Sequence, residues 1–318
     1  MVISSSLLFL FLFLTILCDG QHPVVSHSTD RYLSVSKSNE YDTPIKFPFQ
    51  GAVIMLVSNW REVRYLRKCH FNASMDALAL RWRPHNPNYP VILMNTKPWP
   101  QNDEDIIRDK WPTLEFKFFN IRSIFRSVPN ISKKHFQDAH QPLATMSYKR
   151  MCHFFWKGFT QVPELNEYRY LLRLDDDTCL LNNIEYDLFQ VMYSKGASYA
   201  YSHIWYDYSK DTNGLYSYIN EYIRQHNLSI ANPLLYNTTL TATTFPAQVP
   251  CFNTNFEVID TIQYKLPALM AFVDSIVQSN MIFHRRWGDA PLRYALELLY
   301  WSEREVWRIP DIQLQHSN

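Results

Sequence analysis

Three consecutive acids, Asp175, Asp176 and Asp177, directly follow an apolar segment of the chain. That segment, Tyr168 to Leu174, is rich in Leu and Tyr and has the length of a buried strand. Ligands of open α/β sheets collect where such strands end. Mg²⁺ and Mn²⁺ are commonly held by one or two carboxylates together with a substrate's phosphates. The pattern therefore predicts a metal–diphosphate site for a nucleotide sugar, and its alternative is a solvated acidic turn.

The composition is that of a folded protein without a polyanion-binding surface. The 318 residues are 47% hydrophobic and 15% aromatic, which is enough to bury a substantial core. A net charge of +1, from 31 basic and 30 acidic residues, gives no electrostatic footprint for nucleic acid. With six glycines and no Gly-rich phosphate loop, a Rossmann fingerprint is absent. Phosphates must be held by metal or by side chains.

The first 20 residues have the character of a targeting segment for the secretory pathway. Leu7 to Leu17 is almost entirely Leu, Phe and Ile. This run is shorter than the roughly 20 residues that span a bilayer, which favours a cleaved signal peptide and leaves a short signal-anchor open. Residues 21–46 are polar and are expected to form a stem, and residues 47–318 a catalytic domain. Sequons for N-glycosylation begin at Asn72, Asn130, Asn227 and Asn237.

Cysteines in such a compartment are free to form disulfides. Apart from the leader's Cys18, the chain contains Cys69, Cys152, Cys179 and Cys251. Four cysteines allow three pairings, among which the sequence does not choose. Zinc is disfavoured because there is no Cys-x-x-Cys and the spacings are wide.

The N-terminal half of the predicted domain has an α/β pattern. Ala52–Val57 and Tyr89–Met94 are short apolar runs typical of parallel strands, and Asn59 is a plausible cap for a helix through Glu62 and Leu66. Strand, helix and strand open a nucleotide-binding layer. Residues 99–148 are mixed and basic and are interpreted as scaffold.

Beyond the acids, Ile184 to Met192 is helix-like. The run from Ser198 to Tyr208 is dense in aromatic residues. Sugars stack on such rings, although core packing explains each ring singly as well.

Glu257 is the first candidate catalytic residue of the C-terminal third. It lies between apolar neighbours in Asn255-Phe-Glu-Val258, where a polar group without a purpose is costly. Such an acid can serve as nucleophile or as base. The alternative is a surface acid at a strand edge.

Two more candidates lie in Arg285-Arg-Trp-Gly-Asp-Ala-Pro291. Asp289 is expected to cap the helix that follows, with Pro291 in its first turn. Arg286 could clamp a diphosphate, because guanidinium matches phosphate geometry. Near the end of the chain, His316 is a candidate metal ligand, or else a solvated histidine.

Several motifs together resemble one enzyme family in their order and spacing. They are Ser147-Tyr-Lys-Arg-Met-Cys152, the strand and acids from Tyr168 to Cys179 followed by Tyr186-Asp187, Asn255-Phe-Glu257, and Arg286-Trp-Gly-Asp-Ala-Pro291. On these motifs the chain resembles the fungal-type α-1,2-mannosyltransferases of the Golgi, glycosyltransferase family 15, over about Ala52 to His316.

The resemblance implies a GT-A-like α/β fold with a mixed, mostly parallel sheet flanked by helices. It implies Mn²⁺, GDP-mannose as donor, a mannose-containing glycan as acceptor and retention of configuration. Retaining transfer needs charge neutralised on the departing GDP and a carboxylate near the developing oxocarbenium ion. The resemblance places Asp175 on the family's metal-binding acid and His316 on the histidine proposed to bind the metal. Glu257 falls on the proposed nucleophile or stabiliser, and Tyr148 and Asp289 fall on active-site positions.

Three departures from the family pattern bear on donor identity. Asp175-Asp176-Asp177 replaces Glu-Pro-Gly, so Asp177 is expected to share or take over the metal. Ser58 stands where the family has an Arg, and Ser317-Asn318 stands where it continues with prolines.

The sequence therefore predicts a metal-dependent retaining α-1,2-mannosyltransferase of the Golgi lumen, secreted or attached to the membrane by its N-terminus. Two alternatives remain, a catalytically silent lumenal carbohydrate-binding protein and a GT-A transferase with a different nucleotide-sugar donor.

Overall fold

The computed structural model describes residues 48–58, 60–61, 69–127, 146–208, 211–243 and 248–316. Its strands are β1 (Gly51–Leu56), β2 (Val91–Asn95), β3 (Phe116–Asn120), β4 (Tyr170–Leu174), β5 (Thr178–Leu180), β6 (Tyr199–Tyr201), β7 (Ile204–Tyr208), β8 (Gln248–Phe252), β9 (Phe256–Asp260), β10 (Val306–Arg308) and β11 (Leu314–His316). Its α-helices are α1 (Phe71–Arg81), α2 (Gln101–Lys110), α3 (Arg122–Arg126), α4 (Met146–Trp156), α5 (Leu188–Lys195), α6 (Leu215–His226), α7 (Pro233–Thr243), α8 (Thr261–Tyr264), α9 (Pro267–Ser279), α10 (Met281–His284) and α11 (Asp289–Leu299).

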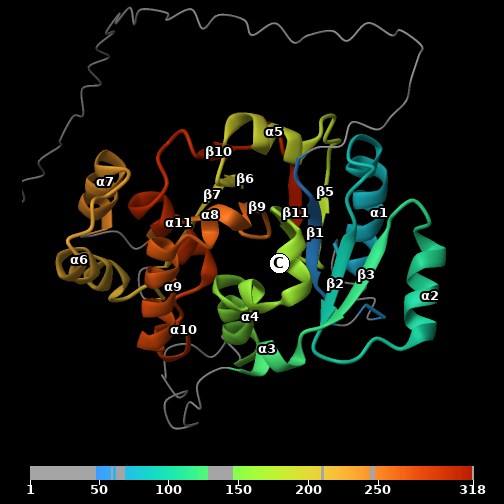
Figure 1. Cartoon of the computed structure of the whole chain (residues 1–318), viewed down its shortest axis with the longest axis horizontal. Coiled ribbons are helices and arrows are strands. Elements are labelled where there is room, and N and C mark those ends of the chain that lie inside the picture. Colours follow the sequence, from blue (N-terminus) through green and yellow to red (C-terminus); the bar gives the residue numbers. More distant parts are fainter. Residues whose placement is uncertain are drawn as a thin grey trace, which may run out of the picture. The chain divides into compact units, whose positions relative to one another are not determined.

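The main sheet reverses its strand order next to β1. Its order is β10-β6-β9-β4-β1-β2-β3, and the strands run parallel except for β9, which is antiparallel to both of its neighbours. The chain moves outward from β1 through β2 to β3 (Figure 1). It then returns to the other side of β1 with β4. Ligands of open α/β sheets bind at such a reversal, beyond the carboxyl ends of the strands. The run of acids after β4 therefore stands at the expected binding edge.

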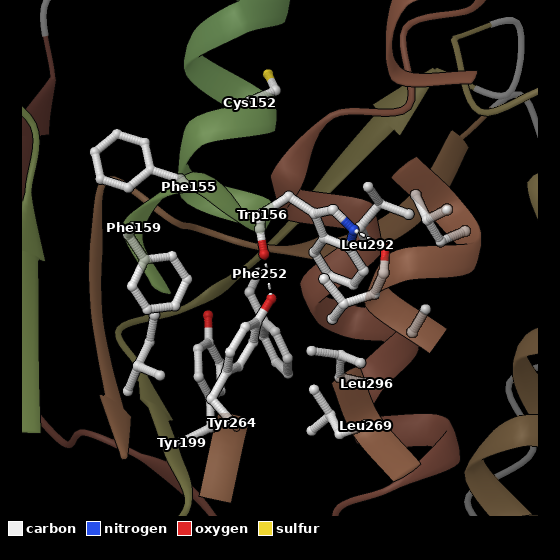
Figure 2. Packing of buried hydrophobic residues seen from close by; sticks show 14 of the residues in the cluster. Cys152, Phe155, Trp156, Phe159, Tyr199, Phe252, Tyr264, Leu269, Leu292 and Leu296 are labelled. Carbon is white, nitrogen blue, oxygen red and sulfur yellow. Dashed lines mark hydrogen bonds between the residues drawn. The ribbon is translucent and has the colours of Figure 1, made fainter. Parts of the chain in front are cut away.

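Successive residues of a strand point to opposite faces of the sheet, and apolar residues occur on both faces here. Helices cover both faces. Ala52 and Ile54 of β1 belong to a buried cluster that includes residues of α4, α9 and α11. Val53 and Met55 belong to a second cluster, with residues of α1 and α5. Figure 2 shows the first cluster, in which aromatic rings from α4, β6 and β8 meet leucines of α9 and α11. Two separate apolar cores thus hold the sheet between helical layers.

The fold class and the main strands predicted from sequence are confirmed. The three predicted strands correspond to β1, β2 and β4, with small shifts of their ends. The predicted scaffold region contains α2, β3 and α3. The leader, the stem, the helix through Glu62 and Leu66 with Asn59 as its cap, and the sequon at Asn130 lie outside the described residues.

Local capping sets where the helix predicted from Ile184 begins and ends. The helix, α5, starts at Leu188, because Oδ1 of Asp187 accepts a hydrogen bond from the backbone N–H of Gln190 at 2.9 Å. It ends at Gly196, which has a φ of 63°. That left-handed conformation costs glycine little.

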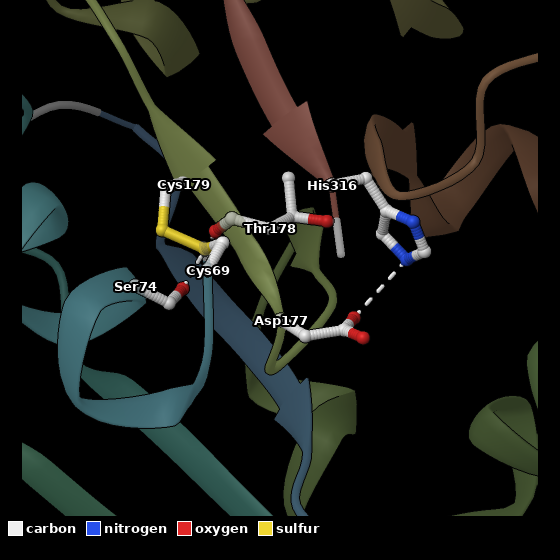
Figure 3. Close-up of a disulfide and its surroundings, with 6 residues drawn as sticks. All are labelled: Cys69, Ser74, Asp177, Thr178, Cys179 and His316. Carbon is white, nitrogen blue, oxygen red and sulfur yellow. Dashed lines mark hydrogen bonds and ion pairs between the residues drawn. A yellow bond between two sulfur atoms is a disulfide. The ribbon is translucent and has the colours of Figure 1, made fainter. Parts of the chain in front are cut away.

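One disulfide joins the segment before α1 to strand β5. Cys69, just before α1, is bonded to Cys179 in β5, while Cys152 and Cys251 are free and buried (Figure 3). The bond closes a separation of 110 residues.

Among the described helices, none combines the length and apolar character that crossing a membrane requires.

Glu297 of α11 makes the stability of this fold depend on pH. Burial, with some repulsion from Glu303, raises the pKa of Glu297 to about 7 from its ordinary value of 4.5. The folded state therefore binds this proton more tightly than the unfolded state, and stability falls as pH rises between those two values.

Replacing Glu297 by Gln should remove this dependence. We expect E297Q to match the wild type near pH 5 and to exceed it at pH 8 by up to about 3 kcal/mol in free energy of unfolding, measured by urea titration at both pH values. Glu303→Gln, which leaves the buried carboxylate in place, should gain less. An equal difference between E297Q and wild type at pH 5 and pH 8 would contradict this assignment.

Candidate active site

A cavity of about 910 Å³ opens at the carboxyl edge of the sheet. Residues that follow β1, β2 and β4 line it, including Ser58, Thr96 and Asp175. Because β9 runs antiparallel to β4, the loop before β9 reaches the same edge and contributes Asn253 and Asn255. The volume lies toward the upper end of the range for small-molecule sites, which extends to about 1,000 Å³.

All three predicted acids line this cavity, and each has a different partner. Asp176 accepts hydrogen bonds from the backbone N–H of Ser58 at 3.0 Å and from its hydroxyl at 3.3 Å, which ties the ends of β1 and β4 together. Asp177 lies 3.1 Å from Nε2 of His316. Asp175 accepts a hydrogen bond from Nε of Arg173 at 2.9 Å. The acids are thus partly buried parts of a cavity, and the alternative of a solvated turn does not describe them.

Asp177 and His316 meet through a second, two-stranded sheet. β11 pairs antiparallel with β5, which places His316 opposite Thr178, the residue after Asp177 (Figure 3). Cys179 in the same strand is held to Cys69, and the Thr178 carbonyl accepts a hydrogen bond from Ser74 at 2.7 Å. The disulfide and α1 therefore support β5, which directly follows Asp177 and pairs with the strand of His316.

The Asp177–His316 pair fits a divalent cation. Carboxylates suit Mg²⁺ and Mn²⁺ whereas imidazole suits transition metals, so a mixed pair favours an ion such as Mn²⁺. Asp175 lines the same cavity but is turned toward Arg173. No three His, Cys, Asp or Glu side chains within the described ranges form a ready metal site. Phosphate oxygens and water would complete the coordination of a bound ion.

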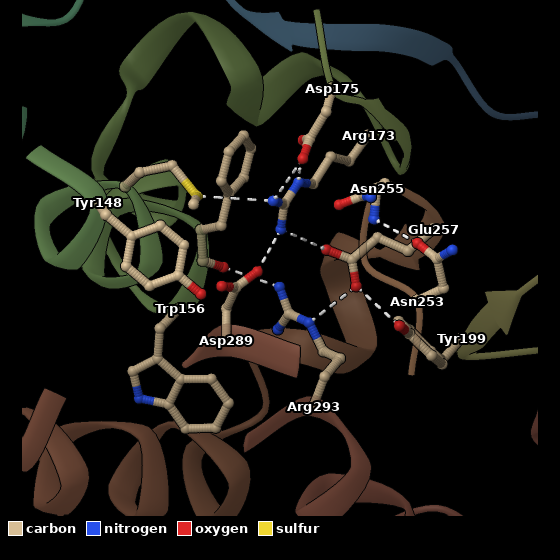
Figure 4. Close-up of polar contacts among 12 residues, drawn as sticks. Tyr148, Trp156, Arg173, Asp175, Tyr199, Asn253, Asn255, Glu257, Asp289 and Arg293 are labelled. Atoms are coloured by element: carbon tan, nitrogen blue, oxygen red, sulfur yellow. Dashed lines mark hydrogen bonds and ion pairs between the residues drawn. The ribbon is translucent and has the colours of Figure 1, made fainter. Parts of the chain in front are cut away.

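Arg173 occupies the centre of the site, although the sequence analysis did not single it out. It is the cross-strand partner of Glu257, so both side chains project from the same face of the sheet, toward α4 and α11. Its guanidinium donates to Asp175, lies 3.5 Å from Oε1 of Glu257 and pairs with Asp289 (Figure 4). The ring of Phe155 lies 3.6 Å from its central carbon. One buried cation therefore connects three carboxylates that come from three elements.

Glu257 is held from its other side by a second buried arginine. Nε of Arg293 donates to Oε2 of Glu257 at 3.0 Å, and the hydroxyl of Tyr199 donates to the same oxygen at 2.8 Å (Figure 4). Arg293 also donates to the carbonyl of Phe155 at 2.7 Å. Two guanidinium groups thus face the three carboxylates of Asp175, Glu257 and Asp289, so each of these buried charges has a partner of opposite sign.

The predicted nucleophile, Glu257, is fully buried and does not line the cavity. Arg173 and Asp289 do line it, and they pair with each other. They lie between Glu257 and the cavity. The alternative of a surface acid at a strand edge is therefore wrong. Its role in chemistry stays a prediction, and in this arrangement it reaches the cavity through Arg173.

The prediction that Asp289 caps α11 is wrong. The N-cap is Gly288, and Asp289 is the first residue of the helix, with its carboxylate directed at Arg173. Burial alone would raise the pKa of Asp289, but Arg173, a hydrogen bond from Cys152 and the charge of Arg293 together outweigh burial, and the pKa lies below its ordinary value. Arg293 lies one helical turn later, which explains why both side chains enter the same cluster.

Tyr148 and Arg286 also line the cavity. Arg286 donates to Asp207 at 3.0 Å and to Asp211 at 2.8 Å, and its other nitrogen donates to the hydroxyl of Tyr148 at 3.3 Å. Two carboxylates thus already balance its charge, and its clamping of a diphosphate stays a prediction. Asp207 lies in the aromatic run of β7, which no motif had connected with Arg286.

Comparisons with known proteins agree with this fold. Core-mannan synthase A of Aspergillus fumigatus, solved in a Mn/GDP form, superposes with a TM-score of 0.72 at 21% identity, over 87% of this chain and 76% of that one. Mannosyltransferase Ktr4p of Saccharomyces cerevisiae in complex with GDP gives 0.71 at 21% identity, over 85% and 71%. The fold is therefore that of the GT-A-type glycosyltransferases.

The family described as glycolipid 2-alpha-mannosyltransferase matches residues 33–318, and the chain belongs to that family. Among curated relatives, the probable mannosyltransferase KTR4 of Saccharomyces cerevisiae is 25% identical over 60% of this chain and 42% of its own length. The alpha-1,2 mannosyltransferase KTR1 of the same yeast is 24% identical over 54% and 44%. The chain thus spans about half the length of the curated relatives it matches.

The arginine–carboxylate cluster should couple Arg293 to Glu257. Removing a partner of a buried charge typically costs about 3–5 kcal/mol, so we expect Arg293→Met to destabilise the protein by that order. In Arg293→Met/Glu257→Gln the second change removes the unpaired charge, and the double variant should recover at least about 1 kcal/mol relative to additivity. Urea unfolding of the four proteins measures this coupling.

Arg169→Met provides the matched control. Arg169, directly before β4, pairs with Asp260 of β9 at 2.9 Å, but its side chain is 28% exposed and Asp260 also caps α8. This control should lose about 1 kcal/mol or less. Equal losses of unfolding free energy for the two arginine variants, with additive behaviour of the double variant, would contradict this coupling. The buried cluster would then stabilise the protein no more than the partly exposed pair does.

Proposed function

We propose that this chain transfers mannose from GDP-mannose to a mannoside acceptor, forming an α-1,2 linkage with retention of configuration and using Mn²⁺. The observation that carries the proposal is the Asp177–His316 pair beside Asp175, in a cavity of about 910 Å³ at the strand-order reversal of a GT-A fold. Family membership and the Mn/GDP form of the Aspergillus fumigatus structure support the choice of metal and nucleotide.

On the donor side, Asp177 and His316 would hold the metal, with Asp175 joining them when it turns from Arg173. A bound divalent cation would neutralise negative charge on the departing diphosphate. Arg173 has other carboxylate partners in Asp289 and Glu257, so the release of Asp175 leaves its charge compensated. Asp176 stays with Ser58 and keeps the two strand ends together.

On the transfer side, Asp289 is the cluster carboxylate best placed to act on an acceptor. It lines the cavity, and Arg173 keeps its pKa low, so it is ionised at neutral pH and accepts a hydrogen bond from a sugar hydroxyl. Tyr148 lines the same space, with its hydroxyl held by Arg286. Glu257 acts from behind, where it fixes the position and the charge of Arg173.

We further propose that the protein works in the Golgi lumen, with the leader as its signal or anchor. The fungal relatives and the hydrophobic first 20 residues support this location. A different donor and a silent carbohydrate-binding protein are less favoured, because a sugar-binding protein has no need for a metal-type pair next to a buried charge cluster.

Calorimetric titration of GDP with and without Mn²⁺ tests the proposal. We expect the protein to bind GDP only when Mn²⁺ is present, to prefer GDP over UDP, and to transfer mannose to methyl α-mannoside. Asp177→Ala and Asp175→Ala should lower the metal-dependent affinity at least about 10-fold, the usual scale for damage to a metal site.

Asp176→Asn is the matched control within the same run of acids. Its amide oxygen can still accept from Ser58, so binding should stay within about threefold of the wild type. Glu257→Gln should bind GDP normally yet lose transfer, because it acts on Arg173 and not on the nucleotide. If neither nucleotide binds with Mn²⁺, the transferase assignment falls in favour of the silent alternative.

A further inference from the structure

The aromatic run of β7 remains outside the roles assigned so far. β7 and β8 form a two-stranded antiparallel sheet, in which Trp205 lies opposite Cys251. Alternation along the strand sends His203, Trp205 and Asp207 toward the cavity, which all three line. Ile204 and Tyr206 point to the other side and do not line it. One face of the hairpin is therefore a wall of the proposed transfer site.

Exposure rises along this wall from the charge cluster to the rim. Asp289 is 3% exposed, the side chain of Asp207 is 17% exposed, and Trp205 is 60% exposed. Asp207 is linked to the centre by Arg286 and Tyr148. The indole thus lies at the mouth of the cavity, on the route from solvent to Asp289.

The indole face is left uncovered by its neighbours. Its cross-strand partner, Cys251, is small and buried, and the neighbours on the same face, His203 and Asp207, are polar. The ring of His203 meets it edge-on at 6.1 Å between centroids. A large apolar ring exposed beside polar groups is the arrangement that binds the apolar face of a sugar while hydroxyls find hydrogen bonds.

The polar groups beside the indole are held rigidly. Nε2 of His203 lies 2.8 Å from the amide nitrogen of Asn253, and the amide oxygen of Asn253 accepts from the backbone N–H of Asn255 at 3.0 Å. The backbone N–H of Asn253 donates to the carbonyl of His203 at 3.0 Å. A fixed wall of this kind loses little conformational freedom when a ligand binds.

We propose that Trp205 forms an outer acceptor subsite, which stacks the second sugar ring of an oligosaccharide acceptor while the first ring receives mannose near Asp289. This inference rests on the proposed transferase function and adds an acceptor preference to it. Trp205 and Asp289 line the same cavity, so one acceptor chain can contact both. The subsite makes acceptors of two or more sugars better substrates than a single mannoside.

Kinetics with two acceptors test the subsite. For Trp205→Ala we expect KM for α-1,2-mannobiose to rise about tenfold, the scale of one aromatic contact. KM for methyl α-mannoside and the affinity for GDP with Mn²⁺ should stay unchanged. Trp205→Phe should retain most of the preference for the disaccharide. Equal effects of Trp205→Ala on both acceptors, or no effect on either, would overturn the outer subsite.

Tyr206→Ala is the matched control, because Tyr206 is the adjacent residue, is 55% exposed and points away from the cavity. It should leave both KM values unchanged. Saturation-transfer NMR of mannobiose with wild type and Trp205→Ala, without donor, reads sugar binding directly. If the wild type binds mannobiose through Trp205 but shows no transfer, the proposed transferase function is wrong and the sugar subsite stands. Binding that is the same in both proteins would remove the subsite.

Discussion

The site depends on one buried guanidinium, that of Arg173. Its side chain is 1% exposed, and it joins Asp175 after β4, Glu257 in β9 and Asp289 at the start of α11. Each of these acids would be costly to bury without a cation, and a lone arginine there would be costly as well. Placing them together makes the sheet edge, the antiparallel strand and the C-terminal helix one electrostatic unit. A substitution of any one of these residues therefore changes the electrostatic environment of the others.

A second support keeps the metal pair apart from this cluster. Asp177 directly precedes β5 and His316 lies in β11, and the Cys69–Cys179 bond holds β5 to the segment before α1. Asp175, between the two supports, faces Arg173 but lines the same cavity. The arginine cluster and the Asp177–His316 pair thus border the same cavity.

Much of the site could be predicted from sequence, because the informative residues occur in short local patterns. Three acids after a strand indicate a binding edge wherever the strand lies. Arg173 carried a signal too, since a charged residue within an apolar strand needs a buried partner. Arg293, one turn after Asp289, gave the same hint. Neither could be connected with Glu257 beforehand, because 84 and 36 residues of chain separate them from it. The capping role expected of Asp289 failed for the same reason, since a cap is a local assignment and its true partner is distant.

The sequence by itself determined the class of fold, the order of the motifs and the identity of the polar residues, because periodicity and spacing are properties of neighbours along the chain. Only the tertiary structure decided which cysteines pair, which carboxylates face the cavity and which lie behind it. It turned Glu257 inward and left Trp205 at the rim. These outcomes depend on strand order and on the antiparallel direction of β9. Both arise from packing between distant segments, and for that reason no local pattern encodes them.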